Sequence, residues 1–151
     1  MPGRVFLDAN VLVYAQDAGS AKKQRVSREI ITRLSASADG VISTQVLQEF
    51  YVAATRKLGV PPLAAKGILK TFAVFETAQV SPALIQEAVD CSILNQLSFW
   101  DALILAATAA AGCGVVLSED LNPGQVILGV KVATVTRRRR GSWRCPASAP
   151  A

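Results

Sequence analysis

The sequence predicts an α/β domain in which helices cover both faces of a mainly parallel sheet. Short apolar runs alternate with longer segments whose apolar residues recur at helical spacing, which is typical of strands joined by helices. Of the 151 residues, 51% are hydrophobic and 18% are charged, which favours a domain with a substantial core. Acidic residues lie just after two of the apolar runs. Because ligands of parallel sheets bind beyond the carboxyl ends of the strands, we expect a site at that edge.

The predicted strands are apolar runs that are too short for helices. Val5-Phe6-Leu7 is the first, and a polar turn at Asp8-Ala9-Asn10 follows it. Gly40-Val41-Ile42-Ser43 is the second. The remaining strands are expected within residues 72–80 and at residues 115–117 and 132–135.

The predicted helices are recognised by their ends. Ser20 and Ser98 stand at capping positions before helices at residues 20–34 and 99–111. Ser43 or Thr44 begins a helix that extends to about residue 57, before the glycine and two prolines at residues 59–62. A further helix is expected at residues 63–71, and Pro82 provides the first turn of another.

The net charge of +5 belongs to the end of the chain. Residues 1–136 contain 11 of the 16 Lys and Arg and all 11 Asp and Glu, so this part is formally neutral. The other basic residues are Arg137, Arg138, Arg139, Arg140 and Arg144. We therefore divide the chain into one domain over residues 1–136 and a basic tail over residues 137–151.

Composition excludes several classes of protein. The absence of histidine excludes a His-based nucleophilic triad. Together with three cysteines that lack CxxC spacing, it also disfavours a zinc site of Cys/His type. Cys91 and Cys113 lie in apolar patterns and are expected to be reduced, buried thiols, which suits a cytoplasmic protein. The longest uncharged stretch, residues 102–118, is shorter than the roughly 20 residues of a membrane-spanning helix. Asp8 interrupts the first apolar run, so we expect neither a signal peptide nor a membrane partner.

Asp8 and Asp120 are the two candidate acids that lie just after predicted strands. Asp8 could be a turn residue, or could cap a short helix that begins at Asn10. Asp120 precedes Leu121-Asn122-Pro123-Gly124, a strong turn sequence that it could serve.

Glu49 and Asp101 lie within predicted helices, again in apolar surroundings. Glu49 falls at the border of the apolar arc of its helix, where a solvated side chain is also compatible. Asp101 follows Ser98 at the spacing of a capping box, and a carboxylate in the first turn suits the helix dipole.

As a set, the four carboxylates point to a metal ion. Neighbouring carboxylates repel one another and raise each other's pKa unless a divalent cation binds between them. Oxygen ligands without histidine favour Mg²⁺ or Mn²⁺, which retain bound water and leave room for phosphate oxygens. Such an ion lowers the pKa of a bound water and stabilises charge on a phosphoryl group.

Four segments, in this order, resemble the PIN-domain family, and in particular the small bacterial toxins of VapC type. They are FLDANVLVY (6–14), STQVLQEFY (43–51), LSFWDALI (97–104) and VLSEDLNPG (116–124). The resemblance implies a three-layer α/β/α sandwich with a mainly parallel central sheet. It also implies an Mg²⁺- or Mn²⁺-dependent endoribonuclease that cleaves RNA, an antitoxin protein that covers the site, and a homodimer.

The resemblance also assigns roles by position. The acidic quartet would be Asp8, Glu49, Asp101 and Asp120, with Asn10 and Ser118 as supporting polar residues. The implied reaction is attack of water on an RNA phosphodiester, leaving a 5′-phosphate and a 3′-hydroxyl. We expect Asp8 and Asp101 to bind the metal, directly or through water. Glu49 would bind a second ion or orient the attacking water, and Asp120 would complete the acidic edge at its periphery.

Three other functions stay open on the sequence. A non-catalytic module of the same fold would only bind RNA or a protein, and an RNA-maturation nuclease would need no antitoxin. A phosphoaspartate enzyme of haloacid-dehalogenase type also begins with a strand and an Asp, but it needs a second Asp where this chain has Asn10. Tyr51 and Leu58 are apolar residues that an antitoxin could cover, or that could belong to the core.

The tail departs from the family pattern. It could be a solvated, disordered segment, or it could track RNA phosphates while Trp143 stacks on a base. Cleavage by a chain that ends at Thr136, compared across salt concentrations, separates the two.

Overall fold

A six-stranded sheet in the order β3-β2-β1-β4-β6-β5 forms the centre of the computed structural model, which describes residues 3–135. Each neighbouring pair is parallel except β5 and β6, which are antiparallel. The prediction of a mainly parallel sheet is therefore confirmed. The strands are β1 (Val5–Leu7), β2 (Gly40–Ser43), β3 (Glu76–Ala78), β4 (Val115–Leu117), β5 (Val126–Ile127) and β6 (Val130–Ala133).

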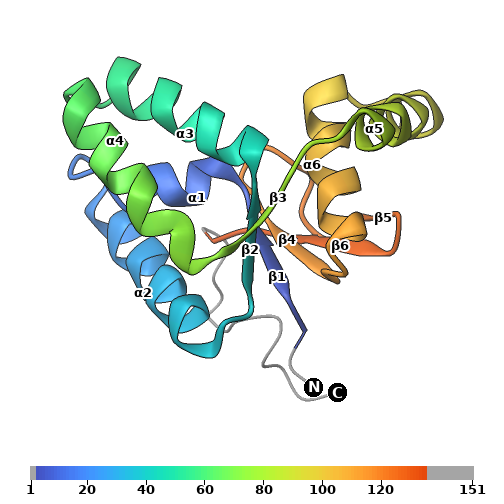
Figure 1. The fold of residues 1–151 in the computed structure, drawn as a ribbon. Helices are drawn as coiled ribbons and strands as arrows, with labels where there is room; N and C mark the ends of the chain where they lie inside the picture. Colours follow the sequence, from blue (N-terminus) through green and yellow to red (C-terminus); the bar gives the residue numbers. More distant parts are fainter. Residues whose placement is uncertain (1–2, 136–151) are drawn as a thin grey trace.

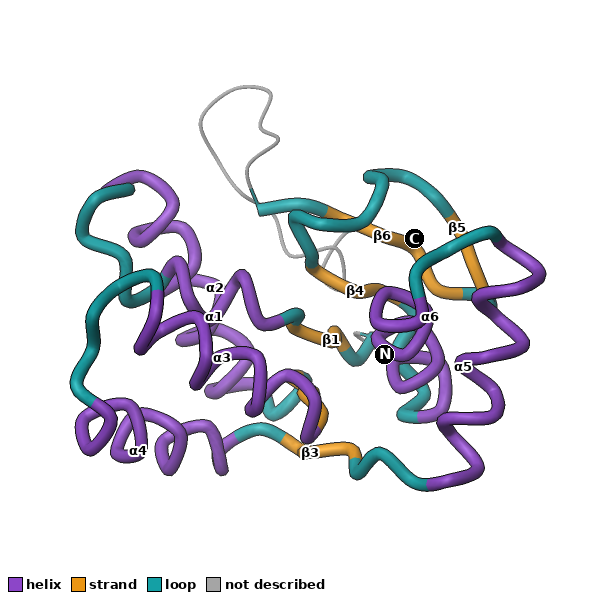
Figure 2. The backbone as a smooth tube through the Cα atoms, turned by 90° about the horizontal axis from the view of Figure 1, so that it is seen from above, coloured by secondary structure: helices purple, strands orange, loops and turns teal. Residues whose placement is uncertain are grey.

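Helices cover both faces of this sheet, which confirms the three-layer α/β/α arrangement. Four helices lie on one side and two on the other (Figure 1), and the view from above shows the same separation (Figure 2). The first group is α1 (Ala9–Tyr14), α2 (Ala21–Ser37), α3 (Thr44–Arg56) and α4 (Pro62–Thr71). The second group is α5 (Pro82–Asn95) and α6 (Phe99–Ala110).

β1 is a central strand, so the residue that follows it lies in the middle of the carboxyl edge of the sheet. All three residues of β1 are fully buried, because β2 and β4 pair with its two edges and helices cover both faces. In the pairing of β1 with β4, Leu7 lies opposite Leu117. The residues that follow these two strands are therefore neighbours at the carboxyl edge.

Close packing against β2 explains a glycine at its first position. A Cβ on Gly40 would lie 2.6 Å from Cδ1 of Phe75 and 3.1 Å from Cβ of Leu34, so glycine lets both side chains approach the strand. Further along the same layer, the rings of Phe50 on α3 and Phe72 meet edge to face, with centroids 4.9 Å apart.

Several boundaries differ from the sequence prediction. The last strand was predicted at residues 132–135, but β6 covers Val130–Ala133, so the predicted bounds are two residues too late. β6 also pairs with β5, a strand that was not predicted. Leu128 and Gly129 both have positive φ in the turn between them, which makes the hairpin possible. In the segment 72–80, only Glu76–Ala78 is a strand, and Phe72–Val74 forms one 3-10 turn.

The start of the chain's first two helices also differs. Residues 9–14 form the complete helix α1, where a turn or a short helix from residue 10 was expected. Ser20 does occupy the N-cap position of α2, but its side chain makes no capping hydrogen bond there.

Two further predictions have definite outcomes. Cys91 and Cys113 are buried free thiols, as expected. Over residues 3–135, no single helix has the length and apolar composition to cross a membrane, although α5 and α6, bent by 117° at their junction, pass that test as a pair. The predicted basic tail lies outside the described residues.

Candidate active site

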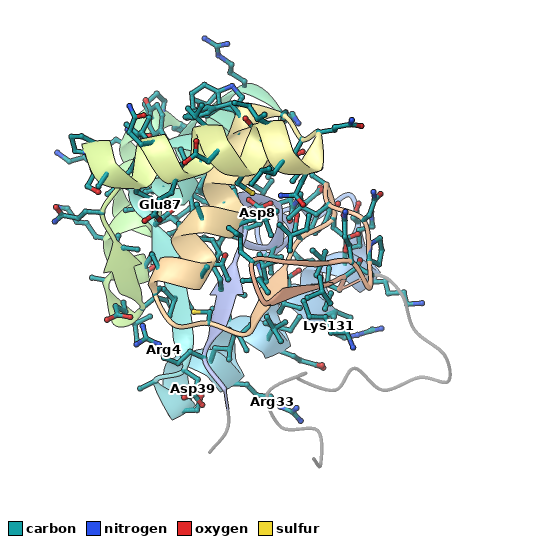
Figure 3. The ribbon with its side chains drawn as sticks, turned by 90° about the vertical axis from the view of Figure 1, so that its right-hand side faces the viewer. Arg4, Asp8, Arg33, Asp39, Glu87 and Lys131 are labelled. Carbon is teal, nitrogen blue, oxygen red and sulfur yellow. The ribbon has the colours of Figure 1, made fainter. Side chains whose placement is uncertain are left out.

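Asp8 lies at the end of β1, away from the end of the sheet where Arg4 and Asp39 are found (Figure 3). Its side chain is only 4% exposed. Oδ1 accepts a hydrogen bond from the Ala9 amide at 2.7 Å, so Asp8 is the N-cap of α1. The capping interpretation from the sequence is thus confirmed, and it leaves the second carboxylate oxygen for another partner.

That partner is Ser118, the first residue after β4. The Ser118 hydroxyl donates to Oδ2 of Asp8 at 2.7 Å, across 110 residues of chain. The Asp8 amide also donates to the Leu117 carbonyl at 3.0 Å, which continues the pairing of the two strands. The Asp120 amide donates in turn to Ser118 Oγ at 3.2 Å. Ser118 therefore supports the first acid, as expected from its position.

The charge on Asp8 is unfavourable in these surroundings. Burial raises the pKa of Asp8 from its ordinary value of 3.8 to about 6, although the hydrogen bonds from Ser118 and Ala9 act in the opposite direction. The negative charges of Glu49 and Asp120 raise this pKa further. Three of the predicted acids are thus close enough to influence one another.

Asp101, the fourth predicted acid, is related to the other three through its effect on Glu49. Glu49 lies on α3, and its Oε1 accepts a hydrogen bond from Gln45 Nε2 at 2.6 Å. Partial burial raises the pKa of Glu49, the bond from Gln45 lowers it, and the charges of Asp120 and Asp101 raise it again. Asp101 lies in the first turn of α6, where its amide donates to Ser98 Oγ at 3.1 Å. One half of the predicted capping box is therefore present.

Two amide side chains near these acids have buried polar atoms without a partner among the described residues. Both side-chain atoms of Asn10, on α1, are of this kind, and so is Oε1 of Gln45. Gln45 was not predicted from the sequence as a functional residue. The available signal was a glutamine one helical turn before Glu49, on the same border of the apolar arc as Glu49.

A groove of about 1130 Å³ runs along α1 and α3 beside the acids. Asn10, Gln45, Glu49 and Asp120 line it, together with Trp100, whose side chain is 63% exposed. The lining of the groove therefore combines polar groups with an exposed aromatic ring. The lining also includes the apolar residues Val13, Val52, Ala53 and Leu58. Two basic residues, Arg56 and Lys57, line the groove as well.

The neighbouring Glu119 belongs to a different set of contacts. Its Oε2 accepts a hydrogen bond from Thr134 Oγ1 at 2.7 Å, and its Oε1 accepts one from the Val135 amide at 3.1 Å. Glu119 therefore points toward the end of the β6 segment, as expected for a residue adjacent to Asp120.

The residues at this edge fit a hard divalent cation that keeps most of its water. The donor set consists of carboxylates, amides and a hydroxyl, which suit Mg²⁺ or Mn²⁺. In the described part of the chain, no three Asp, Glu or Cys side chains converge closely enough to enclose an ion by themselves. A cage of that kind is not required, because Mg²⁺ in phosphoryl-transfer sites is usually bound by one or two carboxylates, water and the substrate.

Comparisons with known proteins bear on both the fold and the family of this chain. A search of curated protein sequences finds no match. Solved structures with the same fold include VapC20 of Mycobacterium tuberculosis, described as a toxin that cleaves the sarcin-ricin loop. It is 23% identical over 74% of this chain and 86% of that protein, with a TM-score of 0.60.

DNA-bound VapBC complexes show the same likeness. The one from Salmonella typhimurium gives 17% identity over 87% of this chain and 98% of its own, with a TM-score of 0.64. The one from Rickettsia felis gives 15% identity over 86% and 97%, with a TM-score of 0.63. The family model of the PIN domain matches residues 5–126, which contain every residue of the site described above. The chain therefore belongs to the PIN-domain family.

Proposed function

We propose that this protein is a metal-dependent endoribonuclease of the cytoplasm and the toxin of a toxin–antitoxin pair. The observation that carries the proposal is the position of Asp8, a buried carboxylate at the end of the central strand whose pKa is raised by burial and by two further acids. A fold that keeps such a charge at its ligand-binding edge loses stability unless a cation is bound there.

In this proposal the four acids bind the metal ion, and their polar neighbours hold the acids in position. Asp8, Glu49, Asp101 and Asp120 would hold Mg²⁺ or Mn²⁺, directly or through water, and the ion would supply an activated water and neutralise phosphoryl charge. Asp8 and Asp101 would bind one ion, and Glu49 would bind a second ion or orient the attacking water. Ser118 and the Ala9 amide fix both oxygens of Asp8, so this carboxylate needs little reorganisation when substrate binds.

RNA would approach along the groove. The exposed indole of Trp100 precedes Asp101 and offers a stacking surface for a base. Arg56, the last residue of α3, and its C-cap Lys57 can neutralise backbone phosphates. Arg56 follows Glu49 by seven residues, or about 10 Å along a helix axis. This separation suits contacts with a phosphate that is not the one being cleaved.

The decisive experiment compares RNA cleavage by the full chain and by Asp8→Asn, with Mg²⁺ or Mn²⁺ and with a chelator. We expect the parent to cleave only with metal and to leave 5′-phosphate ends. Asp8→Asn should abolish cleavage with an unchanged circular dichroism spectrum, because the amide keeps the shape of the side chain but not its charge. Glu29→Gln makes the same change from carboxylate to amide at an exposed position of α2, away from the groove, and is the matched control, which should retain full activity. Metal-dependent cleavage that survives in Asp8→Asn contradicts the proposal.

An antitoxin is the proposed protein partner. Two of the structural neighbours are described as VapBC complexes, and a third is a toxin–antitoxin complex from Klebsiella pneumoniae that is 16% identical to this chain. The groove fits such a partner, because apolar side chains such as Leu58 lie in the same depression as Glu49 and Asp120. An occupant with an apolar face and a basic side chain would cover the site and pair with its acids. Growth arrest on induction that a co-expressed neighbouring small gene relieves would support this partner, and arrest without such relief would contradict it.

We also propose a homodimer that forms through α5. Ile85, Val89 and Ile93 recur at intervals of four residues and are exposed, and Leu94 beside them is 80% exposed. Ile93→Glu with Leu94→Glu should shift the sedimentation coefficient from that of a dimer to that of a monomer. An unchanged coefficient would exclude this face.

A further inference from the structure

Gln45 is the most deeply buried amide side chain near the acids. It is the second residue of α3 and is only 4% exposed. An apolar residue at such a position would bury no polar atoms, so a glutamine needs hydrogen bonds that compensate for lost hydration. The identity of its partners therefore indicates what the residue does.

Both partners of Gln45 Nε2 belong to the candidate active site. The nitrogen donates to Oε1 of Glu49 at 2.6 Å and to the carbonyl of Trp100 at 3.3 Å. Glu49 is on the same helix, one turn later, whereas Trp100 is on α6 in the opposite layer and immediately precedes Asp101. One amide group thus connects the two helices that carry Glu49 and Asp101.

The orientation of the amide is determined by these contacts. Both partners are acceptors, so only the nitrogen of Gln45 can face them, and a flipped amide would place an oxygen against a carboxylate and a carbonyl. The oxygen that remains, Oε1, is buried and has no hydrogen-bond partner among the described residues. In this orientation Oε1 of Gln45 lacks a hydrogen bond within residues 3–135, whereas Nε2 keeps its bonds to α3 and to α6, the two helices that carry Glu49 and Asp101.

We propose that Gln45 is a positioning residue, whose Nε2 holds the Glu49 carboxylate in fixed relation to the α6 segment that carries Asp101. This inference rests on the proposed ribonuclease function and extends it. Glu49 is an exposed side chain with several rotatable bonds, and the bond to a buried, immobile amide restricts them. Without that bond, the acid must lose its rotamer freedom when metal and substrate bind.

The proposal predicts that stability and function respond in opposite directions. In Gln45→Met, an unbranched apolar side chain of similar length replaces the amide and removes the uncompensated Oε1. We expect its thermal midpoint without metal to equal or exceed that of the parent. Its affinity for Mn²⁺, measured by titration calorimetry on the full chain, should fall by about 10- to 100-fold, as is typical when a residue that orients a metal ligand is lost. RNA cleavage should lose kcat with little change in KM.

Two further variants make the test specific. Gln45→Glu keeps the length of the side chain but replaces the donor with an acceptor, so it should lose Mn²⁺ affinity at least as strongly as Gln45→Met. Gln79→Met introduces the same chemical change at an exposed position between β3 and α5, away from the groove, and should leave both affinity and cleavage unchanged. In a Glu49→Gln background, Gln45→Met should cause no further loss, because the residue acts through Glu49.

The outcomes separate the two proposals. A parent that binds Mn²⁺ and cleaves RNA, together with a Gln45→Met that does both equally well, overturns the positioning role alone. A Gln45→Met with a lowered thermal midpoint, or with an equal loss in the Glu49→Gln background, identifies Gln45 as a merely structural residue. A parent that neither binds Mn²⁺ nor cleaves RNA overturns the proposed function, and the role of Gln45 falls with it.

Discussion

The hydrogen bonds of Asp8 stabilise the folded chain, whereas its buried negative charge, which the proposed chemistry needs, destabilises it. The side chain caps α1 and bonds to Ser118, both of which favour the folded state. Its ionisation in a buried position, with the charges of Glu49 and Asp120 nearby, favours unfolding. A neutral residue of the same shape would keep the first contribution and remove the second. This conflict is typical of a residue retained for function.

Asp8→Asn should therefore stabilise the metal-free protein at neutral pH. The pKa of Asp8 is about 6 in the folded chain and 3.8 ordinarily, so the folded state binds more protons than the unfolded state between these values. The contribution of Asp8 to stability is then fully present below about pH 4 and is lost as the pH rises through 6, by about 3 kcal/mol at most. Urea unfolding in a chelator should show the variant more stable than the parent at pH 7 and equal to it at pH 4. Parallel pH profiles for the two proteins would contradict the raised pKa.

Residues differ in how far the sequence reveals their place in the site. Asp8 and Ser118 were predictable because each directly follows a short apolar strand, and the register of parallel strands brings such residues together. Gln45 was not, because its function depends on the Trp100 carbonyl, 55 positions away, and no periodicity reports a contact between two helices in different layers. The acids could be identified from the sequence because they are carboxylates in apolar surroundings. Gln45, which connects the helices that carry Glu49 and Asp101, could be identified only from the structure.

Among the secondary-structure elements, β2 depends on a glycine for its packing. Gly40→Ala should lower the free energy of unfolding by about 1–3 kcal/mol, since the new methyl group would overlap the buried ring of Phe75. Gly67→Ala is the matched control, because nothing lies within 4 Å of a Cβ at this exposed position of α4. It should raise the free energy of unfolding by about 1 kcal/mol through helix propensity. Equal effects of the two substitutions in urea unfolding would exclude the proposed overlap.

The β5–β6 hairpin contains an unfavourable residue at its turn. Leu128 has φ of 54° and is followed by Gly129 with φ of 74°. Leucine avoids positive φ, whereas Asn-Gly is the preferred pair for a turn that needs it at both positions. Leu128→Asn should therefore raise the free energy of unfolding by about 1 kcal/mol, measured by urea denaturation. Val126→Asn, also exposed but in the strand, should not stabilise, and a loss of stability in Leu128→Asn would show that the leucine packs favourably.

This hairpin was missed because the sequence carries no turn signal in it. Residues 126–133 read as a nearly continuous apolar run with a single glycine, so the strand was placed at its end. By contrast, β1, β2 and β4 are separated by helices with clear caps and were placed correctly. Local sequence determined the elements with distinct ends, whereas β5 depends on a backbone conformation that its leucine disfavours.

For the whole molecule, metal binding should offset the repulsion among the acids. At a free ion concentration about 100 times Kd, binding to the folded state alone adds about 2.7 kcal/mol of stability. We expect Mn²⁺ to raise the thermal midpoint of the parent at pH 7 and to raise it less at pH 5, where protons compete for Asp8. Scanning calorimetry with Mn²⁺ or chelator measures this shift. Asp8→Asn should show a much smaller one, and an equal rise in both proteins would place the ion elsewhere.

The arrangement of layers was the most predictable property of the molecule. Alternating strands and helices imply parallel pairing, and parallel pairing places the ends of β1 and β4 at one edge. Which acids influence one another was not predictable. The charge of Asp120, expected at the periphery, acts on both Asp8 and Glu49, whereas Asp101 influences Glu49. These couplings depend on side-chain directions that strand order leaves undetermined.

The strand order also has a consequence for synthesis. β1 lies between β2 and β4, so one edge of β1 stays open during translation until β4 has been made. Ser118, which holds Asp8, leaves the ribosome 110 residues after it. A nascent chain that ends before β4 already contains Asp8, Glu49 and Asp101, but it cannot assemble their surroundings. The proposed active site can therefore form only after β4 and Ser118 have been translated.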